Sequence, residues 1–154
     1  MGKIHCIQYS KLPLSIINYV YNSPGKIVNV KGYKIFSKDD RYLNFIVNGT
    51  KCAKCGLEGR YCKLESRGRG PHLNVYGIDE QGEEVILTKD HIYPKSKGGL
   101  NCINNYQVLC SKCNREKADN SPITLVQALN EGKATKYSVS NAVKRGRPKA
   151  LVGV

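Results

Sequence analysis

The segment Leu87-Thr88-Lys89-Asp90-His91-Ile92-Tyr93-Pro94 decides the fold of this chain, together with Asn105 and the run Cys110-Ser111-Lys112-Cys113-Asn114. It places a carboxylate beside a histidine, then an asparagine, and then a second asparagine directly after a cysteine pair. A second cysteine pair, Cys52-Ala53-Lys54-Cys55, lies upstream. Paired thiolates of this kind indicate a metal-held scaffold, and the neighbouring carboxylate, histidine and amides indicate chemistry beside it.

The cysteines favour a metal site over disulfide bonds. No signal peptide opens the sequence and no apolar run is as long as a membrane span, so we expect a cytoplasmic protein without a membrane partner. Four of the seven cysteines form two Cys-x-x-Cys pairs, and two such turns can close a tetrahedral zinc site through Cys52, Cys55, Cys110 and Cys113. The 54 residues between Cys55 and Cys110 exceed the usual zinc-ribbon spacing, so an inserted unit must bring the pairs together.

Two other uses of the cysteines stay open. A redox-active Cys-x-x-Cys is the alternative to zinc, but neither pair lies in a thioredoxin-like βαβ pattern. Cys62 could combine with His72 as half of a second metal site, although a single Cys and a single His at this spacing are more often packing residues. Cys6 and Cys102 have no assigned role.

Basic residues are concentrated at the two ends of the chain, whose formal net charge is +13. Residues 1–51 carry eight basic and two acidic groups, residues 52–122 carry eleven and nine, and residues 123–154 carry six and one. This distribution favours a polyanionic partner, and the alternative is a surface kept soluble by lysines. We expect a basic DNA-contacting region at 1–48, a zinc-stapled catalytic domain at 49–122, and a helix with a basic tail at 123–154.

The residue patterns predict an α+β fold with basic N- and C-terminal arms. Helices are expected at 14–21, from 111 to about 119, and at 123–130. Strands are expected at 26–36, 41–47, 72–78, 83–91 and 105–109, with a flexible basic loop at 95–99. The first helix and the two strands after it could form a winged-helix fragment. The tail contains Arg145-Gly146-Arg147-Pro148, which resembles an AT-hook that lays two arginines into an A·T minor groove.

The central residues suit phosphodiester hydrolysis. This reaction needs an activated water and a cation that neutralises charge at the phosphate and the leaving oxygen. Asp90 offers a carboxylate and Asn114 an amide oxygen, both suited to Mg²⁺ or Mn²⁺, and His91 can act as general base. Because Asp90 and His91 point to opposite sides of a strand, we expect a distortion at the strand end that lets them converge. Asn105 could hold the adjoining loop through hydrogen bonds to its backbone.

These residues resemble the HNH endonuclease family. The likeness rests on Asp90-His91-Ile92-x-Pro94-x-Ser96-x-Gly98-Gly99 and on Asn105-x-Gln107-x-Leu109-Cys110-x-x-Cys113-Asn114-x-x-Lys117. It covers residues from about 50 to 120 and is closest to the zinc-containing HNH proteins of bacteriophage genomes. The resemblance implies a ββα-metal finger, cleavage of DNA, and products with 5′-phosphate and 3′-hydroxyl ends.

The resemblance also implies a role for each site residue. His91 would be the general base, Asp90 and Asn114 the ligands of the catalytic metal, and Asn105 the orienting asparagine, while the four paired cysteines hold structural zinc. This chain has Asn114 where many members have histidine. We expect DNA contacts, on double-stranded DNA, from six basic residues: Lys95, Lys97, Arg115, Lys117, Arg145 and Arg147. A homodimer would allow both strands to be cut.

Two other functions compete with this interpretation. A zinc-stapled DNA-binding protein without catalysis would need none of Asp90, His91 and Asn114. A protein that binds or cuts RNA is favoured only by the ten tyrosines, which could stack on bases but also fill cores.

Overall fold

The computed structural model describes residues 5–66, 68 and 70–145, and for residues 5–10 only the backbone. Its strands are β1 (His5–Leu12), β2 (Ile27–Val30), β3 (Tyr33–Phe36), β4 (Gly59–Ser66), β5 (Pro71–Ile78), β6 (Glu84–His91) and β7 (Tyr106–Cys110). Its helices are α1 (Ile16–Asn22), α2 (Asp40–Asn48), α3 (Ser111–Lys117), α4 (Leu125–Asn130) and α5 (Lys136–Lys144), with short 3₁₀ turns at Lys95–Lys97 and Ile103–Asn105. The architecture is mixed α/β, as the sequence predicted.

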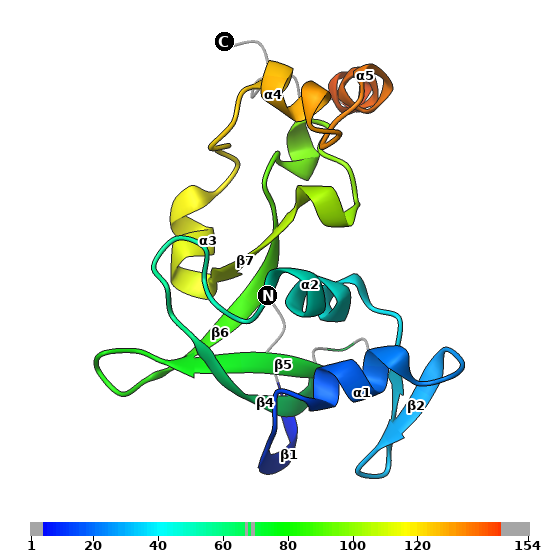
Figure 1. Cartoon of the computed structure of the whole chain (residues 1–154), viewed down its shortest axis with the longest axis vertical. Helices are drawn as coiled ribbons and strands as arrows, with labels where there is room; N and C mark the ends of the chain where they lie inside the picture. The colour runs from blue at the N-terminus through cyan, green and yellow to red at the C-terminus, as the bar shows by residue number, and fades with distance from the viewer. Residues whose placement is uncertain (1–4, 67, 69, 146–154) are drawn as a thin grey trace.

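Five strands form one antiparallel sheet in the order β1-β4-β5-β6-β7, and β2 and β3 form a separate hairpin (Figure 1). Alternating apolar side chains explain the sheet, because every second residue turns to one face. The fully buried side chains include Leu64, Leu73 and Val75, which come from adjacent strands, and Tyr42 of α2. Residues from α1 and α2 join the same core.

The N-terminal region is therefore packed into the fold rather than being an arm. β1 pairs with β4, with partners such as Cys6 and Glu65, and Ile17 and Phe45 lie in the main core. Neither β1 nor β4 was expected from the sequence. The predicted strand at 26–36 is a hairpin, because a two-residue turn at Lys31 and Gly32 brings Val30 opposite Tyr33.

The predicted strand at 41–47 is wrong, because these residues form α2. The Asp39 side chain caps the helix by accepting a hydrogen bond from the Arg41 backbone N–H at 2.8 Å. Tyr42 and Phe45 are both buried, and a spacing of three residues puts them on one helical face. The winged-helix arrangement built on that strand is also not found. Gly49 ends α2 at a φ of 82°.

The C-terminal part packs against the loop after β6. Tyr93, Ala128 and Ala134 form a small second core with Ile123, Leu129 and Val139 around it. The segment 95–99, expected to be a flexible loop, is instead a 3₁₀ turn held under α5. A Cβ on Gly98 would lie 2.7 Å from the Val139 Cα, so only glycine permits this approach. The predicted helix at 123–130 is α4, and α5 follows where a polar tail was expected.

None of the helices in the described residues has the length and apolarity that a bilayer crossing requires.

Candidate metal centre and active site

The four paired cysteines converge at one point of the fold. The Sγ atoms of Cys52, Cys55, Cys110 and Cys113 all lie within 4.8 Å of one another, and those of Cys55 and Cys110 are 3.8 Å apart. A tetrahedral zinc ion with Zn–S bonds of about 2.3 Å separates its sulfur ligands by roughly 3.8 Å. The donor set and its spacing thus fit zinc.

Backbone contacts hold the two halves of this cysteine cluster together. The first pair lies in a turn where the Cys52 N–H donates to the Leu57 carbonyl at 2.9 Å. The Ala53 N–H donates to the Val108 carbonyl of β7 at 2.8 Å. Cys110 ends β7 and caps α3, and Cys113 lies in the first turn of α3. The inserted unit that the spacing required consists of β4, β5 and β6, so the cluster joins the start of this unit to its end.

The surroundings of Cys52 favour the thiolate that a metal needs. Burial opposes ionisation, but backbone N–H groups, those of Cys55, Cys110 and Lys54, lower the pKa of the Cys52 thiol to about 6. Cys62 behaves in the opposite way, because burial within the sheet raises its pKa to about 12. Among the described residues, Cys62 and His72 belong to no group of three or more metal-binding side chains. Cys62 is a packing residue.

Asp90 of β6 and Asn114 of α3 lie on the surfaces through which these two elements face each other. Thr88 and Asp90 point to the same side of β6, and Asn114 and Lys117 lie one turn apart on α3. The Asn114 Nδ2 donates to the Thr88 Oγ1 at 2.9 Å, and the Lys117 Nζ lies 3.1 Å from the Asp90 Oδ2. The Gln107 Nε2 also donates to the Asp90 Oδ2, at 2.9 Å.

These contacts leave metal-binding oxygens available. Among the described residues, nothing donates a hydrogen bond to the Asn114 Oδ1 or to the Asp90 Oδ1. The Thr88 hydroxyl orients the amide of Asn114, and Thr88 is itself fixed by donating to the Leu109 carbonyl at 2.8 Å. One carboxylate oxygen and one amide oxygen suit Mg²⁺ or Mn²⁺, which keep several waters and need few protein ligands. The two side chains therefore fit such an ion.

The His91 imidazole lies on the other side of β6. Its ring meets the Tyr106 ring edge-to-face, with centroids 5.2 Å apart. The His91 Nε2 is 2.8 Å from the Asn101 Oδ1. Because an amide oxygen only accepts, Nε2 carries the hydrogen and the lone pair of the neutral ring is on Nδ1. Burial lowers the pKa of His91 below 6.5, although the hydrogen bond with Asn101 opposes this shift.

Asp90 and His91 do not converge through a strand distortion, contrary to expectation. The pairing of β6 with β7 stays regular from Leu87 to His91, with Asp90 opposite Gln107 and His91 opposite Tyr106. The carboxylate consequently faces α3 and the imidazole faces Tyr106, and the two groups lie at the end of the strand. Lys117 links them, since its Nζ also donates to the His91 carbonyl at 2.9 Å.

Asn105 fixes the loop that follows β6, and its side chain bonds backbone as predicted. Its Oδ1 accepts from the Tyr93 N–H at 2.9 Å, and its Nδ2 donates to the carbonyls of Tyr93 and Leu100, both at 3.0 Å. The side chain is fully buried. These bonds fix the backbone of segment 93–100, and the residue that follows it, Asn101, lies beside His91. Asn101 itself was missed, since a single exposed asparagine in a loop gives no pattern signal.

The basic residues expected to contact DNA differ in their surroundings. Lys95 and Arg115 are exposed, and Lys97 is half-buried in the 3₁₀ turn. Lys117 is 11% exposed and paired with Asp90, so its charge is turned to the protein in this state. Arg145 is exposed at the end of α5, and Arg147, the second arginine of the AT-hook-like motif, lies outside the described residues.

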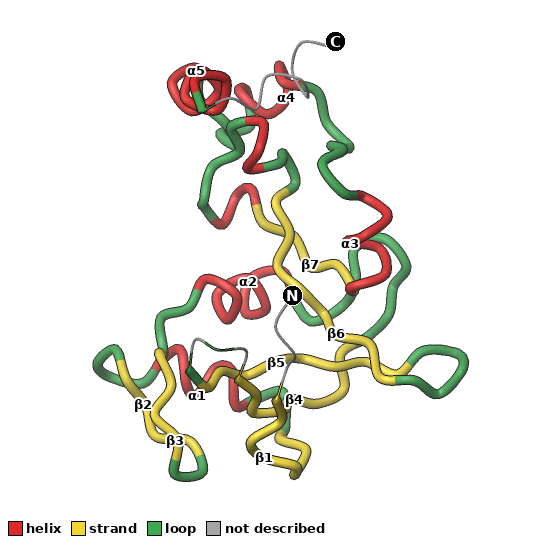
Figure 2. Tube along the Cα trace, turned by 180° about the vertical axis from the view of Figure 1, so that it is seen from behind, coloured by secondary structure: helices red, strands yellow, loops and turns green. Residues whose placement is uncertain are grey.

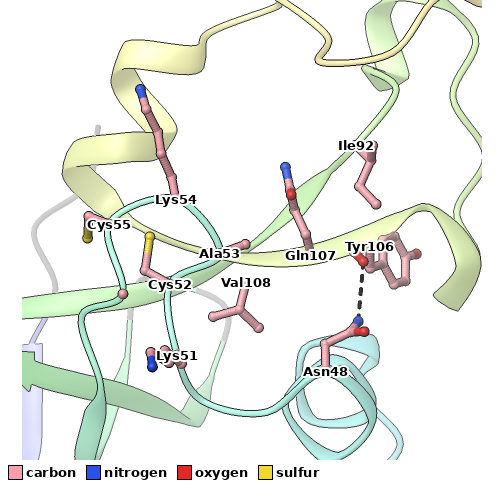
Figure 3. A pocket seen from close by; sticks show the side chains of 11 residues that line it. Asn48, Lys51, Cys52, Ala53, Lys54, Cys55, Ile92, Tyr106, Gln107 and Val108 are labelled. Carbon is pink, nitrogen blue, oxygen red and sulfur yellow. Dashed lines mark hydrogen bonds between the residues drawn. The ribbon is translucent and has the colours of Figure 1, made fainter.

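A hollow of about 610 Å³ lies beside the cysteine turn rather than at His91 (Figure 3). It is lined by residues 51–56, by Tyr106, Gln107 and Val108 of β7, by Ile92, and by Asn48 of α2, whose Nδ2 donates to the Tyr106 carbonyl at 3.2 Å. Its two lysines are already paired, Lys51 with Glu58 and Lys54 with Glu116. It is therefore a weaker candidate for an anion site than the end of β6.

The comparison with protein families agrees with the chemistry at the end of β6. Residues 79–130 match the model of a family described as HNH endonuclease. The match contains β6, β7, α3 and α4, and so Asp90, His91, Asn105 and Asn114, but not the first cysteine pair. Among curated proteins and solved structures no match was found.

Proposed function

We propose that this chain is a metal-dependent DNA endonuclease of the HNH type. The observation that carries the proposal is that Asp90, His91, Asn105 and Asn114, four residues of the matched segment, all lie at one end of the β6-β7-α3 unit. The order of two antiparallel strands, β6 and β7, followed by α3, which bonds to β6, supports the proposal. The coordination of structural zinc by Cys52, Cys55, Cys110 and Cys113 would hold that helix in place.

In the proposed reaction each residue has a separate task. Asp90 and Asn114 would hold a Mg²⁺ or Mn²⁺ ion, which supplies charge neutralisation at the scissile phosphate and the leaving 3′ oxygen. His91, with its free nitrogen at Nδ1, would take the proton from the attacking water. A pKa below 6.5 keeps its ring neutral at pH 7, which is the form a base requires. Asn105 would hold the loop that positions Asn101, and Asn101 would orient His91.

The DNA would meet a strongly basic protein. We propose Lys95, Lys97 and Arg115 as phosphate contacts, together with Arg145 at the end of α5 and with Arg147, which lies outside the described residues. One site cuts one strand, so a single copy would nick double-stranded DNA. Cleavage of both strands would need a homodimer or two successive nicks.

The test is cleavage of supercoiled plasmid by the purified protein with Mg²⁺ or Mn²⁺. We expect open-circle or linear DNA with the wild type and neither with EDTA or with His91→Ala. His72→Ala is the matched control, because it removes a half-buried histidine outside the site and should cut normally. Near-normal cleavage by His91→Ala would overturn the assignment of the base. Binding of DNA without cleavage under every metal and DNA form would instead make the chain a zinc-held DNA-binding protein.

A further inference from the structure

The β2–β3 hairpin stands apart from the five-stranded sheet, beyond α1 (Figures 1 and 2). Its inner face is anchored, because Val28, Val30 and Ile35 are buried in the main core. Hydrogen bonds close its base: the Ser37 N–H donates to the Lys26 carbonyl at 2.8 Å and the Ser37 hydroxyl to the Gly25 carbonyl at 2.9 Å. The hairpin is thus a fixed projection of the fold.

The outer face of the hairpin combines lysines with exposed apolar groups. Alternation places Ile27 and Asn29 of β2 on this face, opposite Phe36 and Lys34 of β3. The side chains of Ile27 and Phe36 are 56% and 50% exposed. Exposed apolar side chains next to positive charge suit an interaction surface.

The charge on this surface has one sign. From residue 13 to residue 38 the chain carries four lysines and no acidic residue. In the described part of the chain, Lys26, Lys31 and Lys34 take part in no ion pair. The fourth, Lys38, donates to the carbonyls of Tyr21 and Ser23 and is used within the protein. The free charges of the hairpin therefore suit a polyanion.

The tip of the hairpin holds a lysine at a position that disfavours it. Lys31 and Gly32 both have positive φ, at 52° and 86°, as in the tight turns where asparagine followed by glycine is preferred. A lysine in this conformation destabilises the turn more than an asparagine would. The turn is held by the Gly32 N–H, which donates to the Asn29 Oδ1 at 2.9 Å. Backbone strain of this kind is frequent at functional positions, and here the strained residue carries a positive charge at the tip of the hairpin.

The hairpin and the His91 ring are linked through α2. β3 leads through three residues into α2, whose first residue, Asp40, accepts a hydrogen bond from the Tyr106 hydroxyl at 2.8 Å. The same Tyr106 ring contacts His91. The hairpin thus leads into the helix that meets the His91 side of the β6-β7 pair.

We infer that the β2–β3 hairpin is a double-stranded-DNA contact that enters a groove, with Lys31 and Lys34 on phosphates and Phe36 and Ile27 towards the groove floor. A two-stranded ribbon fits the major groove, where thymine methyl groups provide apolar contacts. The inference rests on the proposed function only for the identity of the ligand, which is DNA. Residues 27–36 lie outside the family match, so this contact would be a property of this chain's own N-terminal region.

The test is binding of a fluorescent 30-base-pair duplex by the full-length protein without added Mg²⁺ or Mn²⁺ and without chelator, across a series of salt concentrations. For Lys31→Asn with Lys34→Gln we expect weaker binding and a salt slope smaller by about two, since each lost phosphate contact lowers it by about one. The matched control is Lys54→Gln with Lys112→Gln, which removes the same charge from lysines paired with Glu116 and Asp79. The control should keep the slope of the wild type.

Stability measured on the same variants separates contact from folding. Lys31→Asn should unfold at the same or a higher temperature, because asparagine suits the turn, and yet bind DNA less tightly. An unchanged slope in the double variant, or a loss confined to single-stranded DNA or RNA, would overturn the inference. Because no Mg²⁺ or Mn²⁺ is added, the DNA stays intact, and weaker binding with a reduced slope supports the hairpin contact even if the protein never cuts. Cleavage with unaltered binding overturns only the hairpin contact.

Discussion

The side-chain oxygen of Asn101 determines which nitrogen of the neutral His91 ring carries the lone pair. We expect Asn101→Ala to lower the cleavage rate by about ten- to a hundredfold, the usual cost of removing an orienting partner. Nitrogen chemical shifts of the His91 ring should show a mixture of tautomers in the variant and the Nε2–H form in the wild type.

The control for this experiment is Asn104→Ala, which removes an exposed asparagine three residues away. It should change neither rate nor tautomer. A wild-type ring with its hydrogen on Nδ1 would contradict the orienting role of Asn101.

If Asp90 holds a metal ion as proposed, Lys117 would compete with that ion for the carboxylate. Its ammonium lies 3.1 Å from the carboxylate and is mostly buried, so a divalent cation that binds Asp90 must displace or repel it. We expect Lys117→Met to bind Mn²⁺ more tightly, on the order of tenfold, since one charge removed at this distance changes the interaction by more than 1 kcal/mol. Electron paramagnetic resonance of free Mn²⁺ measures this directly.

The neighbouring Arg115→Met removes the same charge from an exposed position and should leave Mn²⁺ affinity almost unchanged. Equal effects of the two substitutions would point to general charge repulsion, and weaker Mn²⁺ binding by Lys117→Met would show that Lys117 supports the site.

At the scale of secondary structure, α2 depends on the cap at Asp39. Burial raises the pKa of this carboxyl, but Arg41, 2.7 Å away, outweighs burial and holds the pKa below 3.8. We expect Asp39→Ala to lower the free energy of unfolding by about 1 kcal/mol, as for other N-caps. The contribution of the charge is present above pH 3.8 and is lost as the pH falls through the lower folded-state pKa.

Asp39→Asn separates the two effects, because asparagine caps helices but cannot pair with Arg41. Urea unfolding at pH 7 should place it between the wild type and Asp39→Ala. If Asp39→Ala were as stable as the wild type, the cap would contribute nothing.

The same helix shows what the sequence could and could not predict. Aromatic and β-branched residues such as Tyr42 and Val47 favour a strand locally, whereas the cap and the tertiary core select a helix. The sequence did not predict β4, because Gly59 and the charged residues of this strand obscure its alternation of apolar and polar side chains. The strands around Asp90 and the convergence of the cysteine pairs were predictable, because ligand spacing constrains them strongly. Asn101 was not, since its role depends on how Asn105 shapes a loop.

For the molecule as a whole, the cysteine cluster connects the turn before the sheet to the end of β7 and the start of α3. We expect the purified protein to carry one zinc per chain and to lose much of its thermal stability with a strong chelator or in Cys110→Ser, because structural zinc contributes directly to folding. Elemental analysis and thermal unfolding measure both effects.

Cys102→Ser is the matched variant, since Cys102 is a half-buried cysteine outside the cluster. It should retain zinc and stability. Full zinc content in Cys110→Ser would exclude the four-cysteine site.

The cysteine turn also covers an edge of the sheet, because β7 is the last strand in the order. Three successive carbonyls of β7 are occupied: those of Tyr106 and Gln107 accept from Asn48 and Asn44, and that of Val108 accepts from the Ala53 N–H. An uncovered edge strand is a template for pairing with other chains. Zinc would then protect the protein against aggregation as well as unfolding.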